Sequence, residues 1–338
     1  MPKEAGQRRP GMGDPAISSL EAYVGAPHLC PNRHCAGMLR QLVPHQNVFF
    51  GGVALSSGWL PPFEDAELWF RERRSWLSNH GFRLETESSG LCSVLTGERA
   101  TPVVAVWSGD LLDEQLFAAH AISLLGQLGR PPQTLLFNCR STRPRRVRGM
   151  SGRYPRELSE IVPYELGARE FSDAQRVWSA VTASTPEPLN VIFKSCPSSD
   201  LFSAVPELAG RFPSARDGLD RWESWLLKAF SCSQEDIGSI VASCIAEGQS
   251  FSADRMNDEH LLARVSELSD SSTESSLLRL EGEGPLMTAR ARITVFGEQV
   301  LRGELNRLRI NTIDRHVGGV LISNEEPWCF DGHAIRRL

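Results

Sequence analysis

The chain has 338 residues, of which 41% are hydrophobic and 23% charged, and its formal net charge is −5 at pH 7. This length favours two domains over one, and the slightly acidic charge argues against general binding of nucleic acid or other polyanions. Because no run of about 18 apolar residues occurs, we expect no transmembrane helix and no membrane contact.

Residues 1–22 are rich in glycine, proline and charged side chains, and no apolar segment follows them. A secretory signal needs such a segment. We therefore predict a disordered tail over 1–22 and a cytoplasmic location. Eight cysteines are scattered without a Cys-x-x-Cys pair, and an even count alone does not imply disulfides in a chain of this length.

Short apolar segments alternate with helical patterns in the next part of the chain. The segments 28–30 and 47–50 are predicted as buried strands, and 36–42 is predicted as a helix between them. A loop rich in glycine and proline follows, and then a second predicted helix at 67–80. Alternating strands and helices are typical of a parallel α/β sheet.

The segment 103–128 is the clearest unit of the chain. It predicts a buried strand (103–107), a polar turn (108–110) and an amphipathic helix. One face of this helix carries apolar residues at three- and four-residue spacing, namely Phe117, Ala121, Leu124, Leu125 and Leu128. His120 lies in this stripe, where we expect a core histidine. Because another buried strand is predicted at 134–138, we place a parallel-sheet α/β domain at 23–140.

An arginine-rich stretch follows the last of these strands. Residues 140–156 contain seven arginines and no acidic residue. We predict an arginine-rich linker over 141–168. The alternative is an anion-binding loop, because clustered guanidinium groups suit phosphate and carboxylate.

The pattern after residue 168 is mostly helical. Helices are predicted at 172–181, 201–212, 219–230, 234–246 and 259–268. A strand pair at 277–281 and 290–295 follows, and helices followed by such a pair give the winged-helix order. We therefore expect a mainly helical, winged-helix-like domain at 169–338. Its candidate recognition helix at 234–246 has two acidic residues and no lysine or arginine, so we expect packing or protein contact and no nucleic-acid binding.

The C-terminal segment 311–331 contains a glycine turn, an apolar strand and Trp328. We predict a terminal hairpin formed by 317–323 and 328–330. Because a lone hairpin is only marginally stable, we expect this segment to pack against the winged-helix layer or the α/β domain. Arg315 is expected to pair with a carboxylate at that seam.

Several segments resemble bacterial proteins of the DUF1835 family, a group without an assigned general function. They are HLCPNRHCAGMLRQL and SGWLPP near the N-terminus, VWSGDLLDEQL in the centre, and FPSARDGLDRWESWLL, ITVFGEQVLRGELNRLRINTIDRHVGGVLI and WCFD towards the C-terminus. The resemblance spans residues 26–332 and implies an α/β domain followed by a helical, winged-helix-like region. Family members often carry a Glu-His pair before the aspartate of the central motif, whereas this chain has Ser108 and Gly109 there.

Most candidate site residues lie at the carboxyl ends of predicted strands, where open parallel sheets bind ligands. Asp110, Asp113 and His28 are the candidate catalytic residues, and the alternative for the two aspartates is stabilisation of the helix that follows. The candidate ligand-binding residues are Cys30, Asn32, Ser108, Gly109, Arg140 and Arg315. The spacing of Cys30, His34 and Cys35 matches no common zinc site, so no metal is expected, and the sequence specifies no cofactor.

These residues predict a site for a small anionic or nucleotide-like ligand at the strand ends. We interpret the chain as a bacterial biosynthetic or tailoring enzyme. The alternative is a non-catalytic regulatory or protein-interaction protein that uses the winged-helix-like region.

Overall fold

The computed structural model describes most of the chain, namely residues 20–51, 55–62, 66–80, 90–140, 149–197, 199–233, 235–270, 275–282 and 284–338. The predicted tail lies mostly outside these residues, as does the arginine-rich stretch at 141–148. Among the helices in this part of the chain, none has the length and apolar character needed to cross a membrane. All eight cysteines are free thiols.

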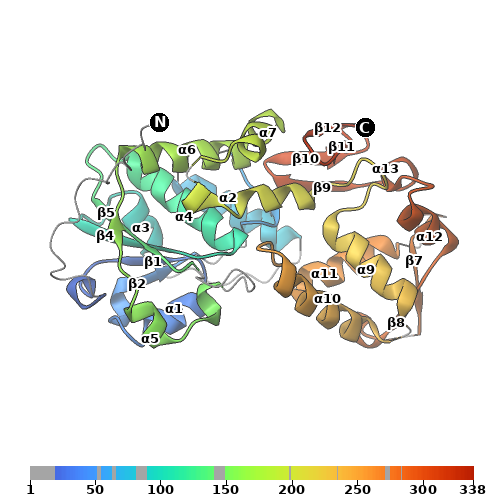
Figure 1. Ribbon diagram of the computed structural model, residues 1–338, viewed down its shortest axis with the longest axis horizontal. Coiled ribbons are helices and arrows are strands. Elements are labelled where there is room, and N and C mark those ends of the chain that lie inside the picture. The colour runs from blue at the N-terminus through green and yellow to red at the C-terminus, as the bar shows by residue number, and fades with distance from the viewer. Residues whose placement is uncertain are drawn as a thin grey trace, which may run out of the picture.

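A five-stranded, mostly parallel sheet forms the centre of the N-terminal half (Figure 1). Its strands, in spatial order, are β2 (Val48–Phe50), β1 (His28–Cys30), β4 (Val103–Ser108), β5 (Gln133–Asn138) and β6 (Tyr164–Glu165). Only β6 runs antiparallel to its neighbour. The other strands are buried almost throughout, as expected when helices cover both faces of a parallel sheet. The predicted α/β class is confirmed, and the strand order reverses between β1 and β4.

Helix α4 (Leu112–Gln127) follows β4 and is buried on all sides. The sequence predicts an amphipathic helix, and this prediction is wrong, because every residue from 114 to 125 is buried. The outer face is covered by α6 (Ala168–Thr182). Trp178 of α6 and Trp69 of α2 (Ala66–Asn79) enclose His120, and each indole centroid lies 4.4 Å from the imidazole centroid. His120 is thus the core histidine that the sequence predicts, and burial lowers its pKa to about 3.

The described part of the predicted linker at 141–168 packs against the α/β domain through a few buried side chains. Met150 and Leu158 are buried in the cluster on one face of the sheet, and β6 extends the sheet itself. Trp178, Ile192 and Phe202 share the main hydrophobic cluster with the sheet, so the predicted boundary at residue 169 falls inside this core. The remaining short helices here are η1 (Leu20–Tyr23), α1 (Arg33–Leu39), η2 (His45–Asn47), α3 (Leu91–Leu95), η3 (Met150–Gly152), α5 (Pro155–Ser159), α7 (Glu187–Lys194), α8 (Ser199–Phe202) and η4 (Val205–Arg211).

Residues 219–305 surround a second hydrophobic cluster, and we call this unit the small lobe. Its elements are α9 (Arg221–Cys232), α10 (Ile237–Phe251), α11 (Asp258–Leu268), β7 (Leu278–Glu281), η5 (Leu286–Thr288), β8 (Arg290–Ile293) and α12 (Val295–Arg302). β7 and β8 pair antiparallel, and Asp236 forms an isolated bridge with Arg290. We call the rest of the chain the large lobe. Figure 1 shows the sheet and the small lobe at opposite ends of the long axis.

The C-terminal residues return to the large lobe, as predicted. The elements are α13 (Arg307–Ile310), β9 (Asp314–Gly318), β10 (Val320–Ser323), β11 (Trp328–Phe330) and β12 (Ile335–Arg337). β9 runs parallel to β3 (Gly58–Trp59), and Val317, Val320 and Ile322 are buried in the main cluster. The predicted hairpin is wrong in its pairing, because β10 pairs with β9 and β11 pairs with β12.

Candidate functional site

The two lobes meet at a polar cluster beside the first turn of α4. The N–H of Leu112 donates to the carbonyl of Ala253 at 2.9 Å, which ties α4 to the segment between α10 and α11. Asp113 is largely buried, and its Oδ1 accepts a hydrogen bond from the Ser56 N–H at 2.7 Å. Burial raises the pKa of Asp113, although the Ser56 N–H and Arg211 act in the opposite direction. Asp113, a predicted catalytic residue, therefore faces the interface between the lobes.

Arg211 and Asp254 form a buried ion pair at the centre of this cluster. The Nη2 and Nε atoms of Arg211 lie 2.6 and 2.7 Å from the two carboxylate oxygens, which is a bidentate arrangement. The same guanidinium donates to the hydroxyls of Ser56 at 3.2 Å and Ser57 at 3.4 Å. Trp222 donates its indole N–H to Asp254 at 3.1 Å. One ion pair thus holds the loop before β3 against the small lobe.

Arg73 and Gly58 fix the shape of that loop. Arg73 of α2 is fully buried and donates to the carbonyl oxygens of Ser57 and Trp59. Gly58 has a φ of +71°, and a Cβ at this position would lie 2.0 Å from the ring of Trp76. Only glycine fits such a position without rearrangement. The loop therefore has a defined conformation at the lobe interface.

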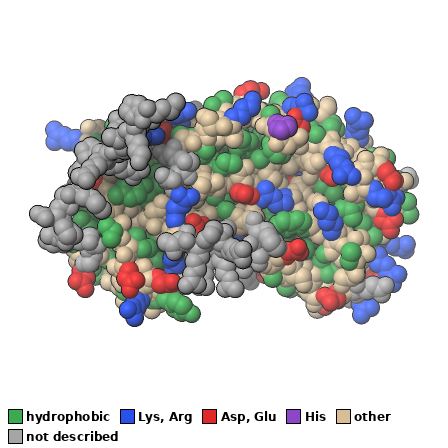
Figure 2. Space-filling model, viewed as in Figure 1, with side chains coloured by type: hydrophobic (Ala, Val, Ile, Leu, Met, Phe, Trp, Pro, Cys, Tyr) green, Lys and Arg blue, Asp and Glu red, His purple; other side chains and the backbone are tan. Residues whose placement is uncertain are grey.

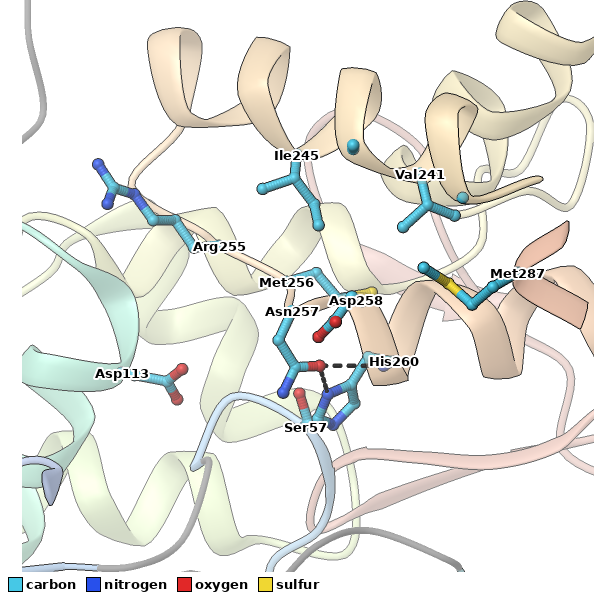
Figure 3. A pocket seen from close by; sticks show the side chains of 12 residues that line it. Ser57, Asp113, Val241, Ile245, Arg255, Met256, Asn257, Asp258, His260 and Met287 are labelled. Atoms are coloured by element: carbon cyan, nitrogen blue, oxygen red, sulfur yellow. Dashed lines mark hydrogen bonds between the residues drawn. The ribbon is translucent and has the colours of Figure 1, made fainter. Parts of the chain in front are cut away.

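Two cavities adjoin the cluster, and Ser57 and His260 line both of them. We call the first the apolar-walled cavity; its volume is about 600 Å³, and its other lining residues are Asp113, Gly238, Val241, Ala242, Ile245, Arg255, Met256, Asn257, Asp258 and Met287. Figure 3 shows Val241 and Ile245 on α10 along one side of this cavity and Asp113 on another. Volumes of this order at a domain interface are typical of small-molecule sites.

We call the second the arginine cavity; its volume is about 370 Å³. Its other lining residues are Ser56, Gly58, Trp76, His80, Arg211, Ala263, Arg264, Glu267, Asp314, Arg315, His316 and Val317. Three guanidinium groups and three imidazoles thus surround one space between α2, α11 and β9. In the part of the chain that the structure describes, no group of three or more His, Cys, Asp or Glu side chains is arranged to hold a metal ion.

His260 belongs to the first turn of α11. Its Nδ1 faces the Oδ1 of Asn257, which caps the helix by accepting a hydrogen bond from the His260 N–H at 2.9 Å. Burial lowers the pKa of His260 to about 3, and Arg211, Arg264 and Arg73 contribute in the same direction. Burial and these guanidinium groups therefore favour the neutral imidazole.

Arg315 pairs with a carboxylate at the lobe seam, as predicted. Its Nη1 and Nη2 lie 2.6 and 3.1 Å from the two oxygens of Glu223 in α9, and Nη1 lies 3.3 Å from Asp220. Arg307 donates to the same Glu223 carboxylate. Burial alone would raise the pKa of Glu223, but Arg307 and Arg315 hold it well below its usual value. Arg315 therefore joins β9 to the small lobe, far from the strand ends, while it also lines the arginine cavity.

Asp110 and Arg140 meet at the carboxyl ends of β4 and β5. Their side chains approach to 3.9 Å, and Arg140 donates to the hydroxyl of Ser203 at 2.7 Å. These two predicted residues are thus brought together at the sheet edge. Neither of them lines the apolar-walled cavity or the arginine cavity.

His28 and Cys30 are both buried and held by internal contacts. The Nδ1 of His28 accepts the indole N–H of Trp107 at 3.0 Å, and its Nε2 donates to the carbonyl of Tyr23 at 2.9 Å. Burial lowers the pKa of His28 to about 4. The Cys30 thiol donates to the carbonyl of Phe49 at 3.3 Å, and burial raises its pKa. Both side chains are therefore buried and have hydrogen-bond partners within the large lobe.

The other predicted strand-end residues also make internal contacts. Asn32 caps α1 by accepting the N–H of Cys35 at 2.9 Å. The Ser108 hydroxyl lies 3.5 Å from the carbonyl of Glu114, and the Gly109 carbonyl accepts from Gln115 at 3.0 Å. The loops that follow β1 and β4 are therefore organised by their own hydrogen bonds.

Sequence reasoning missed the small-lobe half of the cleft and the loop before β3. Arg211, Asp254 and His260 belong to no motif, and the available signal is the polar run at 254–258 between two predicted helices. Ser57 lies in a glycine- and proline-rich loop that predicts only irregular structure.

Glu114 is a second residue that the sequence analysis passed over. Its carboxylate is buried and accepts the N–H of Met150 at 2.6 Å and that of Leu111 at 3.3 Å. Burial raises its pKa from 4.5 to about 7, against the effect of these two hydrogen bonds. Glu114 thus holds the segment at 149–152 against the carboxyl end of β4.

We expect Glu114 to make the protein less stable as the pH rises from 4.5 to 7. The folded pKa lies above the unfolded value, so the protonated form favours folding, and this contribution is lost as the pH rises through the folded pKa. The loss should reach up to about 3 kcal/mol. Urea denaturation of the wild type and of Glu114→Gln at pH 5 and pH 8 checks this. The variant should lack this part of the pH dependence of the free energy of unfolding. An unchanged pH dependence in the variant would contradict it.

Comparison of the chain with protein-family models gives no match, and a search of curated proteins gives none either.

Proposed function

We propose that this protein binds a small anionic ligand in the arginine cavity between the lobes. The carrying observation concerns Arg264 and Arg315, which both line this cavity. The Nε atom of each is buried and has no hydrogen-bond acceptor within the described chain, although the Nε of Arg264 lies 3.7 Å from Oδ2 of Asp220. Buried donors are nearly always satisfied, so the Nε of Arg315 in particular favours a ligand or ordered water with acceptor oxygens in this cavity.

The charge around His260 supports the same proposal. Burial and three nearby arginines lower the pKa of this imidazole, and a bound anion would act on it in the opposite direction. The hydroxyls of Ser56 and Ser57 line the arginine cavity and supply neutral hydrogen-bonding groups. This proposal keeps the ligand class that the sequence predicts, but moves the ligand from the strand ends to the cleft, where two predicted residues remain: Arg315 in the arginine cavity and Asp113 in the apolar-walled cavity.

The resemblance to the DUF1835 family also agrees with a site in the cleft. Three of the segments that carry it contribute lining residues: SGWLPP contributes Ser57, VWSGDLLDEQL contributes Asp113, and the long C-terminal segment contributes Arg315 and His316. Segments from three distant parts of the chain thus converge on one place. We propose that the chain is a DUF1835-like protein and that this cleft is its functional site.

We propose further that the bound anion is a substrate. An anion beside His260 would favour the imidazolium and raise the pKa of this residue towards neutrality. A histidine that titrates near neutral pH can act as a general base. Asn257 would orient the ring through Nδ1. This supports the enzyme role expected from the sequence.

The winged-helix order of the small lobe supports a packing role more than binding of nucleic acid. α9, α10 and α11 precede the β7–β8 pair, and Asp236 forms one isolated bridge to β8. In that arrangement α11 is the third helix, and His260, Arg264 and Glu267 of α11 line the arginine cavity. The exposed residues of α11 are Asp258, Ala263, Ser266 and Glu267, none of them basic. Figure 2 shows acidic and basic side chains interspersed on the visible face. Such a mixture of charges disfavours the binding of a polyanion to this face.

Isothermal titration of the full chain with inorganic phosphate tests the proposed binding. We expect saturable binding to the wild type and at least a tenfold loss of affinity in Arg264→Gln, about 1.4 kcal/mol. The matched control is Arg309→Gln, because Arg309 is exposed and does not line the cleft. Equal affinity of both variants and the wild type would contradict the proposal, as would the absence of binding to phosphate, acetate and simple phosphate esters.

A further inference from the structure

We infer that the two cavities hold a single ligand, an anion that carries an alkyl or acyl chain. Its head would lie in the arginine cavity and its chain in the apolar-walled cavity. This inference rests on the proposed function and specifies its ligand class. The starting observation is that Ser57 and His260 line both cavities, so the two spaces adjoin at these side chains.

The wall formed by α10 suits an apolar chain. Val241, Ala242 and Ile245 lie on one stripe of this helix and line the cavity (Figure 3). Ala242 is exposed and Ile245 is half-buried, so part of this stripe is not covered by the rest of the described protein.

Two methionines complete the apolar side of the cavity. Met256 is buried and Met287 is 43% exposed. Methionine side chains are flexible and polarizable and adapt to ligands without a fixed shape. An extended hydrocarbon chain is a ligand of that kind.

The side chains that line the two cavities indicate which cavity holds the anionic head and which holds the chain. The apolar-walled cavity is lined by the acidic side chains of Asp113 and Asp258 and by one guanidinium, that of Arg255. The arginine cavity is lined by three guanidiniums, each of which is also paired with a carboxylate: Arg211 with Asp254, Arg264 with Glu267 and Arg315 with Glu223. The anionic head is placed in this cavity by the buried Nε of Arg315, which has no acceptor within the described chain, and this leaves the chain along α10.

Titration of the full-length protein with methyl phosphate and octyl phosphate, below the concentration at which octyl phosphate aggregates, tests this inference. We expect octyl phosphate to bind at least tenfold more tightly than methyl phosphate. Ala242→Trp should remove this advantage by filling the space along α10, and should leave the affinity for methyl phosphate unchanged. The matched control is Ser243→Trp, because Ser243 is exposed on the same helix and does not line the cavity.

The outcomes separate the inference from the proposed function. Equal binding of methyl and octyl phosphate, or an octyl advantage that survives in Ala242→Trp, would overturn the inference and leave the anion site standing. If octyltrimethylammonium binds as tightly as octyl phosphate, the alkyl chain binds without recognition of an anionic head. That result would also overturn the inference. If neither phosphate ester nor inorganic phosphate binds, the proposed function fails, and the inference fails with it.

Discussion

Removal of residues 311–338 is expected to destabilise the entire protein and not only its C-terminal end. Five aliphatic residues of this segment are buried in the large-lobe core: Ile313, Val317, Val320, Ile322 and Ile335. Each contributes about 1.5–3 kcal/mol by burial, which together approaches the total stability of about 5–15 kcal/mol of a typical domain. The deletion also removes the strand that pairs with β3 and one of the two arginine partners of the buried Glu223, namely Arg315.

Thermal denaturation followed by circular dichroism checks this prediction. The deletion variant should show no cooperative transition at the wild-type temperature. Ile322→Ala provides a graded comparison, because a single large-to-small change in a core costs about 2–5 kcal/mol and should lower the melting temperature without abolishing folding. A deletion variant with the wild-type melting temperature would show that β9–β12 are dispensable.

Glu223→Gln is expected to destabilise the protein by about 3–5 kcal/mol, because it leaves buried guanidiniums without their full counter-charge. The wild-type carboxylate is fully buried and accepts from both Arg307 and Arg315, which are themselves almost inaccessible to solvent. Asp220 lies within 3.3 Å of Arg315 and offsets part of the loss.

Chemical denaturation of Glu223→Gln and of a matched surface variant measures this effect. The control is Glu298→Gln, since Glu298 lies 3.5 Å from Arg302 and both side chains are about half exposed. An exposed pair of this kind contributes about 0–1 kcal/mol. A cost in Glu223→Gln no larger than in Glu298→Gln would contradict a structural role for the buried cluster.

The sequence predicts those parts of the fold that depend on local pattern. The strand, turn and helix at 103–128 are predicted by one continuous apolar pattern. The ion pair of Arg315 is predicted because the apolar terminal segment must be buried against the rest of the protein. The burial of α4 was not predictable in the same way. Its outer face carries Gln115 and Ser123, which predict exposure, and its cover comes from α6 and α2, whose positions depend on tertiary packing.

The candidate site also combines features set by local sequence with features set by tertiary packing. Asp113 and Glu114 are neighbours in the first turn of α4, and consecutive residues of a helix point about 100° apart. One therefore faces the lobe interface and the other the segment at 149–152. Because either acid also stabilises a helix N-terminus, the sequence alone cannot rank them. Arg211, Asp254 and His260 reach the cleft only because the chain leaves the large lobe near residue 213 and returns to it after residue 305.

The position of a bound anion tests the central claim most directly. Selenate has the shape and charge of a tetrahedral anion, and its selenium can be located by anomalous scattering in crystals of the full chain. We expect the strongest anomalous peak in the arginine cavity, within hydrogen-bonding distance of Arg264 or Arg315. A peak at the sheet edge between Asp110 and Arg140, with none in the cleft, would contradict the proposed site and return the ligand to the strand ends.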